Sequence, residues 1–193
     1  MTWQGDAAAR VDGWMLPSEL DWLACEASTR KRIVEVGCWR GRSTKALSLA
    51  TPGIVWAIDA WDTSLDRQWG ENWQLSKAEW DGVYAEFRRN LEPEYRAGKV
   101  IVLRRNDHDA LEALRLQQGD GWVDMAFIDG DHREVKVREN IEDCIPLLAP
   151  RALLCGHDWN IPDVERAVRA LLPEAEVMRD GMIWWTIWKG GSR

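Results

Sequence analysis

The amino-acid sequence predicts an α/β fold: a doubly wound, mostly parallel sheet with helices on both faces. First, short apolar segments rich in β-branched residues recur along the chain, at residues 32–37, 54–59, 99–104, 123–129 and 152–158. Second, most of these segments precede a stretch with the apolar spacing of an amphipathic helix, which is the order expected of parallel strands covered on both faces. Third, two strand-like segments near the C-terminus flank Asp180 and Gly181, a dipeptide that favours an antiparallel hairpin.

The elements can be placed in order along the chain. Residues 1–30 form a leading segment with a capping helix that begins at Pro17. The helices expected after the apolar strands lie at residues 42–50, 109–117, 135–148 and 163–172. The two strands of the final hairpin are expected at residues 175–180 and 182–188.

The segment 61–98 is longer than a simple crossover between two strands requires, and it is rich in tryptophan. Long insertions of this kind often serve as lids or as walls of a substrate site. We expect this segment to cover a site, with Trp69, Trp73 and Trp80 as candidate pocket residues. The length of the chain suits one domain over residues 1–193.

The composition excludes several kinds of partner. The chain has 193 residues, of which 30% are charged, and a formal net charge of −7. Affinity for a phosphate backbone rests on clustered Lys and Arg, so neither nucleic acid nor an anionic membrane surface is expected to bind. No apolar run approaches the ~20 residues of a membrane span, and the first residues carry no export signal. We expect a cytoplasmic protein that acts on a small molecule.

The four cysteines are scattered, without C-x-x-C spacing, and at least two lie in apolar stretches. We expect Cys25, Cys38, Cys144 and Cys155 to be buried thiols and not disulfides or zinc ligands.

Polar and ionisable residues gather directly after the predicted strands. In an open parallel sheet, ligands bind outside the carboxyl ends of the strands, where neighbouring crossovers diverge to opposite faces. The residues at these positions are Glu35, Gly37, Gly41, Arg42, Ser43, Asp59, Asn106, Asp107, His108, Asp109, Asp129, Asp131, His132, His157 and Asp158. All three histidines of the chain are among them. The sequence therefore predicts a functional site at this edge of the sheet.

The first strand leads through a glycine-bearing turn, "VEVGCWRGRST", into a helix. Gly37 and Gly41 permit positive φ and a close approach of the backbone to a ligand, and the N-terminus of the following helix can face an anionic group. Asp59 ends the next strand and is placed to accept hydrogen bonds from both hydroxyls of a ribose. Trp61 follows it and either covers an adenine or packs in the core.

Four motifs together resemble the class I S-adenosylmethionine-dependent methyltransferases. They are "IVEVGCWRGRST", "WAIDAWD", "MAFIDGDH" and "LLCGHDWNIPDVERAV", in this order and spacing. The strongest resemblance is to the small branch that includes macrocin-type and cephamycin-pathway O-methyltransferases, and it covers roughly residues 30–172. It implies a Rossmann-like methyltransferase fold with a seven-stranded sheet, which the predicted hairpin would complete.

The resemblance also implies roles for individual residues. Glu35, Gly37 and Gly41 would line the methionine end of S-adenosylmethionine, Asp59 would hold its ribose, and Asn106 and Asp107 would lie by the adenine. Ser43, Trp61 and Asp129 complete the predicted cofactor-binding set.

Relatives of this branch commonly bind Mg²⁺ or a similar cation. The corresponding residues here are Asp129, His157 and Asp158. The sequence departs from the pattern at His157, where the relatives have Asp, and imidazole is a poorer ligand than carboxylate for a hard cation. A softer ion, or none, is the alternative.

His132 is the predicted general base, because its ordinary pKa lies near neutrality and deprotonation of a hydroxyl group needs a base of this kind. Asp131 would serve as base or would orient His132. The alternative is that Asp131 and His132 only cap the helix that follows.

Two other functions remain open at this point. A dinucleotide-dependent oxidoreductase shares the ribose-binding carboxylate, but it favours a G-x-G-x-x-G turn, whereas residues 37–42 read G-C-W-R-G-R. A protein of the same fold that binds the cofactor without turnover is the other alternative. The methyl acceptor stays open between sugar hydroxyls, phenols, other metabolites and nitrogen atoms. The tryptophan-rich hairpin, with Trp184 and Trp185, would suit either the core or a homodimer contact.

Overall fold

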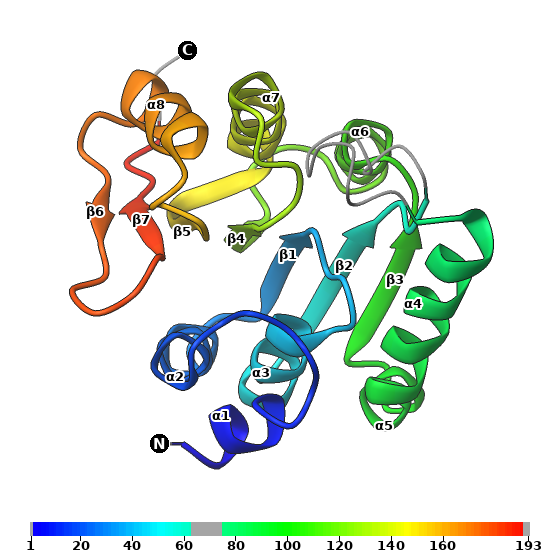
Figure 1. Cartoon of the computed structure of the whole chain (residues 1–193). Helices are drawn as coiled ribbons and strands as arrows, with labels where there is room; N and C mark the ends of the chain where they lie inside the picture. Colours follow the sequence, from blue (N-terminus) through cyan, green and yellow to red (C-terminus); the bar gives the residue numbers. More distant parts are fainter. Residues whose placement is uncertain (1, 63–74, 191–193) are drawn as a thin grey trace.

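The computed structural model of the chain describes residues 2–62 and 75–190 and contains a seven-stranded sheet (Figure 1). The strands lie in the order β3-β2-β1-β4-β5-β7-β6. Their bounds are β1 Arg32–Val36, β2 Ile54–Asp59, β3 Val100–Arg104, β4 Val123–Ile128, β5 Leu148–Gly156, β6 Glu176–Val177 and β7 Trp184–Ile187. The first five strands pair in parallel, whereas β7 is antiparallel to both β5 and β6. The predicted α/β class and the C-terminal hairpin are confirmed.

Helices cover both faces of this sheet (Figure 1). One face carries α1 Trp3–Ala8, α2 Pro17–Ala27, α3 Arg42–Ala50 and α4 Lys77–Asn90, and the short α5 Glu92–Arg96 follows α4. The other face carries α6 Asp107–Gln118, α7 Glu134–Cys144 and α8 Pro162–Leu171. Successive side chains of a strand point to opposite faces, so Ile33 packs under the first group and Val34 under the second.

The chain changes faces between two neighbouring strands at the centre of the sheet. β1 and β4 pair directly, but α3, which follows β1, and α7, which follows β4, lie on opposite faces. The loops after the two strands therefore diverge, and such a switch point leaves room for a ligand at the carboxyl ends.

Several element boundaries differ from the prediction. The helix expected at residues 135–148 ends at Cys144 and continues as a 3-10 turn over Ile145–Leu147, because Pro146 lacks the N–H that would extend the helical hydrogen bonds. The final hairpin is shorter than expected, since its loop spans residues 178–183 and is closed by a 2.8 Å bond from Met178 N to Ile183 O.

Four further expectations concern the cysteines, Trp184, membrane-spanning helices and the predicted lid. Cys38, Cys144 and Cys155 are buried free thiols, but Cys25 is exposed on α2, so the prediction that it is buried was wrong. Trp184 is 1% exposed and packs on Gly156, where an added Cβ would lie 2.4 Å from the indole ring. In the part of the chain that the structure describes, no helix is long and apolar enough to cross a membrane. Within the predicted lid at 61–98, residues 63–74, which include Trp69 and Trp73, lie outside the described residues.

Candidate active site

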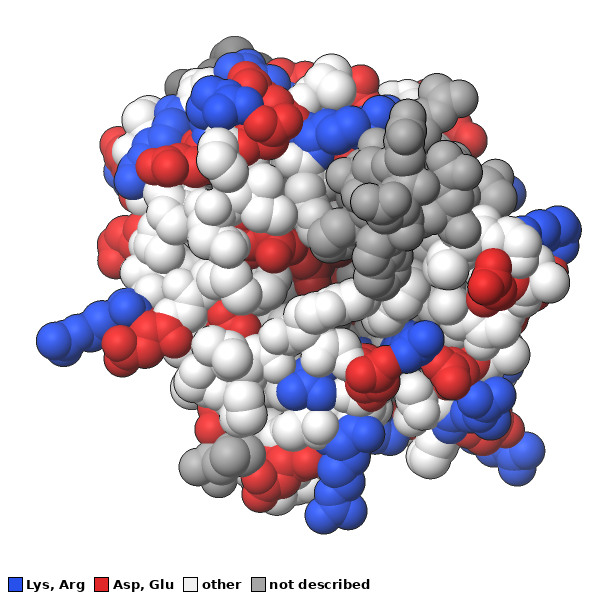
Figure 2. Space-filling model, in the orientation of Figure 1, with Lys and Arg blue, Asp and Glu red and all other residues white. Residues whose placement is uncertain are grey.

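A cavity of about 1080 Å³, part of it open to solvent, lies at the carboxyl ends of the parallel strands. In Figure 2, acidic side chains lie in the recess near the centre of the face shown. The predicted site residues that line the cavity are Gly37, Arg42, Ser43, Asp59, Asn106, Asp107, Asp129, Asp131, His132, His157 and Asp158. Five residues that the sequence placed here, Glu35, Gly41, Trp61, His108 and Asp109, do not line it.

The leading segment contributes one wall of the cavity, through Gly13, Trp14 and Met15. Arg42, at the start of α3, holds this segment in place, because its guanidinium donates to Ala9 O at 3.0 Å and to Met15 O at 2.9 and 3.1 Å. Sequence reasoning assigned the segment only a capping role and missed its contact with the site.

Asp59 organises the turn after β1. Its Oδ2 atom accepts 2.9 Å hydrogen bonds from the backbone N–H groups of Cys38 and Trp39, and Oδ1 accepts one from Trp61 N at 2.8 Å. Burial raises the pKa of this carboxyl, against the effect of these bonds. The predicted ribose ligand therefore lines the cavity, but most of its acceptor capacity serves the loop that forms the cavity wall.

Glu35 lies beneath the cavity and is fully buried. Its Oε1 atom accepts a 2.5 Å hydrogen bond from Ser43 Oγ, whereas Oε2 has no hydrogen-bond partner among the described residues. Burial raises the pKa of Glu35 to about 7. Glu35 therefore does not reach the cavity itself but is hydrogen-bonded to Ser43, which lines the cavity.

Gly37 and Gly41 both have positive φ, but a side chain would collide with a different part of the structure at each position. Gly37 has a φ of +83°, and an added Cβ would lie 2.1 Å from the backbone oxygen of Asp129, so the ends of β1 and β4 could not approach. Gly41 has a φ of +88° and faces Leu91, with an added Cβ 2.3 Å from Leu91 Cδ2. Its predicted cofactor contact is therefore replaced by packing against the end of α4.

Trp61 belongs to the core and not to an adenine site. It is fully buried, its ring centroid lies 4.7 Å from that of Phe87, and its indole N–H donates to Trp39 O at 2.8 Å. The aromatic side chains that line the cavity are Trp14, Trp39 and Trp80. Trp39 lies 5.5 Å from each of the other two rings, measured between centroids.

Trp80 was named as a candidate pocket residue from the sequence, and it lines the cavity. Trp39 was missed, although it lies inside the glycine turn that the sequence analysis singled out. Nothing in the leading segment marked Trp14 as a cavity residue.

Asn106 and Asp107 lie where α6 begins, at the end of the cavity formed by β2 and β3. Asn106 caps the helix, because its Oδ1 atom accepts from His108 N at 3.1 Å. His108 itself pairs with Asp143 at 2.7 Å and does not line the cavity.

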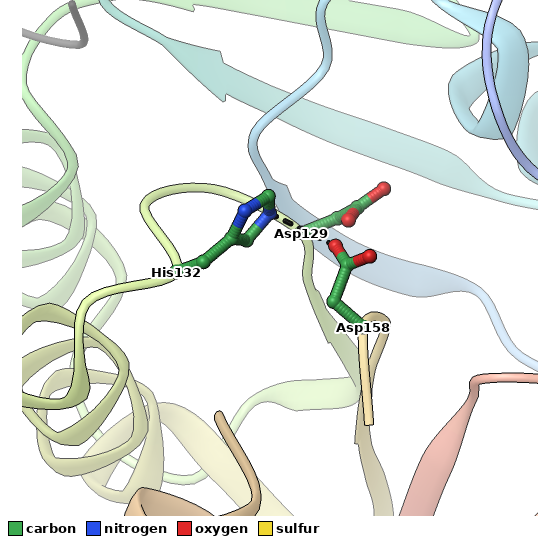
Figure 3. Close-up of side chains that lie close together, drawn as sticks. All are labelled: Asp129, His132 and Asp158. Atoms are coloured by element: carbon green, nitrogen blue, oxygen red, sulfur yellow. Dashed lines mark ion pairs between the residues drawn. The ribbon is translucent and has the colours of Figure 1, made fainter. Parts of the chain in front are cut away.

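Asp129, His132 and Asp158 form a cluster at the opposite end of the cavity (Figure 3). Asp129 follows β4, His132 lies in the loop before α7, and Asp158 follows β5. His132 Nε2 lies 2.9 Å from Asp158 Oδ2, and one ligand atom from each residue lies within 4.8 Å of the other two. The three side chains together offer one nitrogen and two oxygen atoms, and this arrangement could bind a metal ion.

His157 is held from two sides. Its Nε2 atom lies 3.2 Å from Glu19 Oε2, and Nδ1 lies 3.3 Å from Asp158 Oδ1 and 3.6 Å from Asp129 Oδ1. Burial lowers the pKa of His157, but the three carboxylates outweigh it and raise this pKa to about 11. Nε2 thus faces Glu19, and Nδ1 faces Asp158 and Asp129, so each ring nitrogen is directed at a carboxylate. In the group of side chains that could hold a metal ion, His132 stands where the sequence predicted His157.

Asp131 is also used differently from the prediction. It is buried, and its carboxylate accepts from the backbone N–H of Arg133 at 2.9 Å and from the Arg133 guanidinium at 2.9 and 3.0 Å. It thus shapes the turn before α7, and the carboxylate that orients His132 is Asp158.

The ionisation of the cluster follows from its burial and its contacts. Burial raises the pKa of Asp129 to about 8, with a further contribution from Asp158. Burial opposes ionisation of Asp158 too, but its bonds to His132 and His157 hold its pKa below the ordinary value. The pKa of His132 is raised, because the interaction with Asp158 outweighs burial.

Comparison with known proteins gives a family match and a set of similar folds. The family model described as "Methyltransferase domain" matches residues 34–159, and no curated protein matches significantly. The cofactor-bound protein Rv0187 from MTB shares 18% identity over 97% of this chain and 87% of its own, with a TM-score of 0.69.

Two other solved structures extend this comparison. The O-methyltransferase from Bacillus cereus, solved in complex with SAH, shares 18% identity over 96% of this chain and 88% of its own, with a TM-score of 0.64. The O-methyltransferase TomG from Streptomyces achromogenes, solved with SAM, shares 16% identity over 92% and 82%, with a TM-score of 0.67. Likeness at these identities shows a common fold.

Proposed function

We propose that the chain, which belongs to the methyltransferase-domain family, uses S-adenosylmethionine and methylates an oxygen atom of a small-molecule acceptor. One observation carries the proposal. A single cavity joins Gly37 after β1, Ser43 at the start of α3 and Asp59 at the end of β2 to the cluster of Asp129, His132 and Asp158. A cofactor bound along the first group would present its methyl group toward the second.

The chemistry of the cavity suits S-adenosylmethionine, which carries a sulfonium and an ammonium group. Among the described residues its carboxyl groups outnumber its cations: Asp59, Asp107, Asp129, Asp131 and Asp158 line the cavity, with Arg42 and His157, whose pKa is raised to about 11. The unpartnered Oε2 atom of Glu35 adds a buried acceptor behind Ser43. We propose that Gly37, Ser43 and Asp59 hold the methionine and ribose parts, and that Asn106 and Asp107 lie by the adenine.

S-adenosylmethionine supplies an electrophilic methyl carbon on sulfur and leaves as S-adenosylhomocysteine. The chain must then orient the acceptor and remove its hydroxyl proton. His132 is suited to this, because Asp158 accepts from Nε2–H at 2.9 Å and so places the lone pair of the neutral ring on Nδ1. The proton passes from the acceptor oxygen to Nδ1 as the oxygen–methyl bond forms, and Asp158 stabilises the resulting imidazolium. Trp14, Trp39 and Trp80 exclude water from part of the cavity.

The same cluster supports a second role for these residues. Asp129, His132 and Asp158 offer a nitrogen and two carboxylate oxygens, a set that suits Mn²⁺, Fe²⁺ or Zn²⁺ better than Mg²⁺. A cation there would favour the ionised form of an acceptor hydroxyl. His132 cannot be ligand and base through the same nitrogen, so the two roles predict different responses to chelators.

Calorimetric titration with S-adenosylhomocysteine and S-adenosylmethionine tests the function directly. We expect binding of both, and methyl transfer from labelled cofactor to one member of a panel of phenols and sugar hydroxyls. Absence of binding at millimolar concentrations would refute the proposal. Transfer only to amines would refute the choice of oxygen.

A further inference from the structure

Glu19 is a fully buried carboxylate that lies outside the cavity and joins three distant segments. Its Oε2 atom accepts from Leu16 N at 2.7 Å and faces His157 Nε2 at 3.2 Å. Its Oε1 atom accepts from Met182 N at 2.6 Å in the hairpin loop. A carboxylate without solvent is costly unless it is fully paired, and these contacts supply the pairing. Although burial opposes ionisation, the contacts keep the pKa of Glu19 below its ordinary value.

A continuous series of contacts leads from Glu19 to the candidate base. His157 lies between Glu19 and Asp158, and Asp158 Oδ1 lies 3.3 Å from His157 Nδ1. The other carboxylate oxygen of Asp158 lies 2.9 Å from His132 Nε2. Each oxygen of Asp158 is therefore matched to one imidazole, and the orientation of the carboxylate depends on both rings.

Backbone and side-chain contacts together set this arrangement. His157 N donates to Ile128 O at 3.0 Å, which ties the end of β5 to β4. Asp158 then adopts a φ of 59°, a left-handed conformation that is unfavourable for a residue with a side chain. Backbone hydrogen bonds from Trp159 N to Met182 O at 3.0 Å and from Ile161 N to Asp158 O at 2.8 Å help to hold the residue there, and the contact with the ring of His157 orients its carboxylate.

We propose that Glu19 is a positioning residue of the methyl-transfer site: it fixes the ring of His157, which orients Asp158 and through it His132. The assignment to methyl transfer rests on the proposed function above. The N-terminal helix α2 thereby contributes to the geometry of the base without touching the cavity.

Glu19→Gln tests this because it preserves shape and removes one acceptor oxygen. The amide can still accept from Met182 N, but its NH₂ group then faces the donors on Leu16 and His157. An amide in place of a carboxylate can force the wrong tautomer on a neighbouring histidine. Asp21→Asn is the matched control, since Asp21 is also on α2 and accepts from Thr2 N and Oγ1, at 2.6 and 2.8 Å, away from the cavity.

The chain has three histidines, so the imidazole nitrogens can be followed individually by NMR of ¹⁵N-histidine-labelled protein, without a cofactor or an acceptor. In Glu19→Gln we expect the ring signals of both His157 and His132 to move, although Glu19 does not contact His132. His108, which pairs with Asp143, reports whether the fold is intact. In Asp21→Asn the ring signals of all three histidines should not shift.

Affinity and turnover give a second readout. We expect Glu19→Gln to bind S-adenosylhomocysteine within about threefold of wild type, while kcat with an identified acceptor falls by about 10–100-fold, as for other residues that orient a reactive side chain. A general loosening of the N-terminal segment would instead weaken cofactor binding in both variants, because Gly13 to Met15 line the cavity.

Three outcomes would overturn the inference: unchanged His132 signals in Glu19→Gln, equal effects of the two substitutions, or loss of cofactor affinity without loss of kcat. If Glu19→Gln does not fold, the wild-type spectrum decides, since the Nε2–H group of His157, which faces Glu19 Oε2 at 3.2 Å, should be visible and protected from exchange with water. A His157 ring without a proton on Nε2 would exclude the arrangement. Failure of the proposed function has a separate signature, the absence of S-adenosylhomocysteine binding in the wild type.

Discussion

His132 Nε2 lies 2.9 Å from Oδ2 of Asp158, although the two residues come from loops that follow different strands. β4 and β5 are parallel neighbours, so their carboxyl ends, and the residues after them, lie together. An imidazole oriented by a carboxylate is the arrangement that enzymes use for a general base. His132 therefore has a partner that the positions of the two residues in the sequence do not predict.

Substitution of His132 by Gln should reduce kcat by about 10²–10⁴-fold, because a general base is removed while the polarity of the side chain is kept. Binding of S-adenosylhomocysteine, measured by calorimetry, should change little. His108→Gln is the control, because His108 is exposed and pairs with Asp143 outside the cavity. Equal activity in the two variants would contradict the role of His132.

Removal of divalent cations separates the two roles of the cluster. If His132 is the base, methyl transfer should be unchanged by EDTA, since no step requires a cation. Activity that is lost on chelation and restored by Mn²⁺ would assign the cluster to metal binding instead. In that case Asp129→Asn should weaken Mn²⁺ binding, measured by calorimetry, because it removes one of the carboxylates.

Gly37→Ala should lower the free energy of unfolding by at least about 2 kcal/mol, through the combined effects of left-handed backbone strain and steric collision. The φ of Gly37 is +83°, and an added Cβ would meet Asp129 O at 2.1 Å. Gly98→Ala measures the backbone strain without the collision, since Gly98 has a φ of +70° and no neighbour within 4 Å. The free energy of unfolding of this variant should fall by only about 1 kcal/mol. Urea unfolding measures both, and similar values would show that the strand ends tolerate the methyl group.

Glu35 should make the cofactor-free protein less stable as the pH rises. Burial raises its pKa from 4.5 to about 7, and Asp59 adds to this. The folded protein therefore holds a proton that the unfolded chain loses between these values. The contribution to stability is full below pH 4.5 and is lost as the pH rises through about 7.

The neutral variant Glu35→Gln cannot show this loss. Its stability relative to wild type, from urea unfolding, should increase by about 2–3 kcal/mol between about pH 5 and about pH 8. Titrating groups that do not interact with Glu35 contribute equally to both proteins and cancel in the difference. A difference that does not vary with pH would contradict the raised pKa of Glu35.

The sequence by itself determined the architecture and the edge of the sheet at which the site lies. Strand after strand, from "RIVEVG" to "ALLCGHD", is apolar because both faces are covered, and polar residues follow each strand because its carboxyl end opens toward a ligand. This reasoning placed Gly37, Asp59, Asp129, His132 and Asp158 at the cavity, where the structure has them.

Only the tertiary structure decided which of these side chains pair. Asp131 binds Arg133, Trp61 packs in the core while Trp39 lines the cavity, and His157 faces Glu19, which is 138 residues earlier in the chain. The order of residues along a strand fixes where its end lies, but not the direction in which a loop side chain points. That direction is set by the hydrogen bonds and charges that segments far apart in sequence bring to it, and they meet only when the chain is folded.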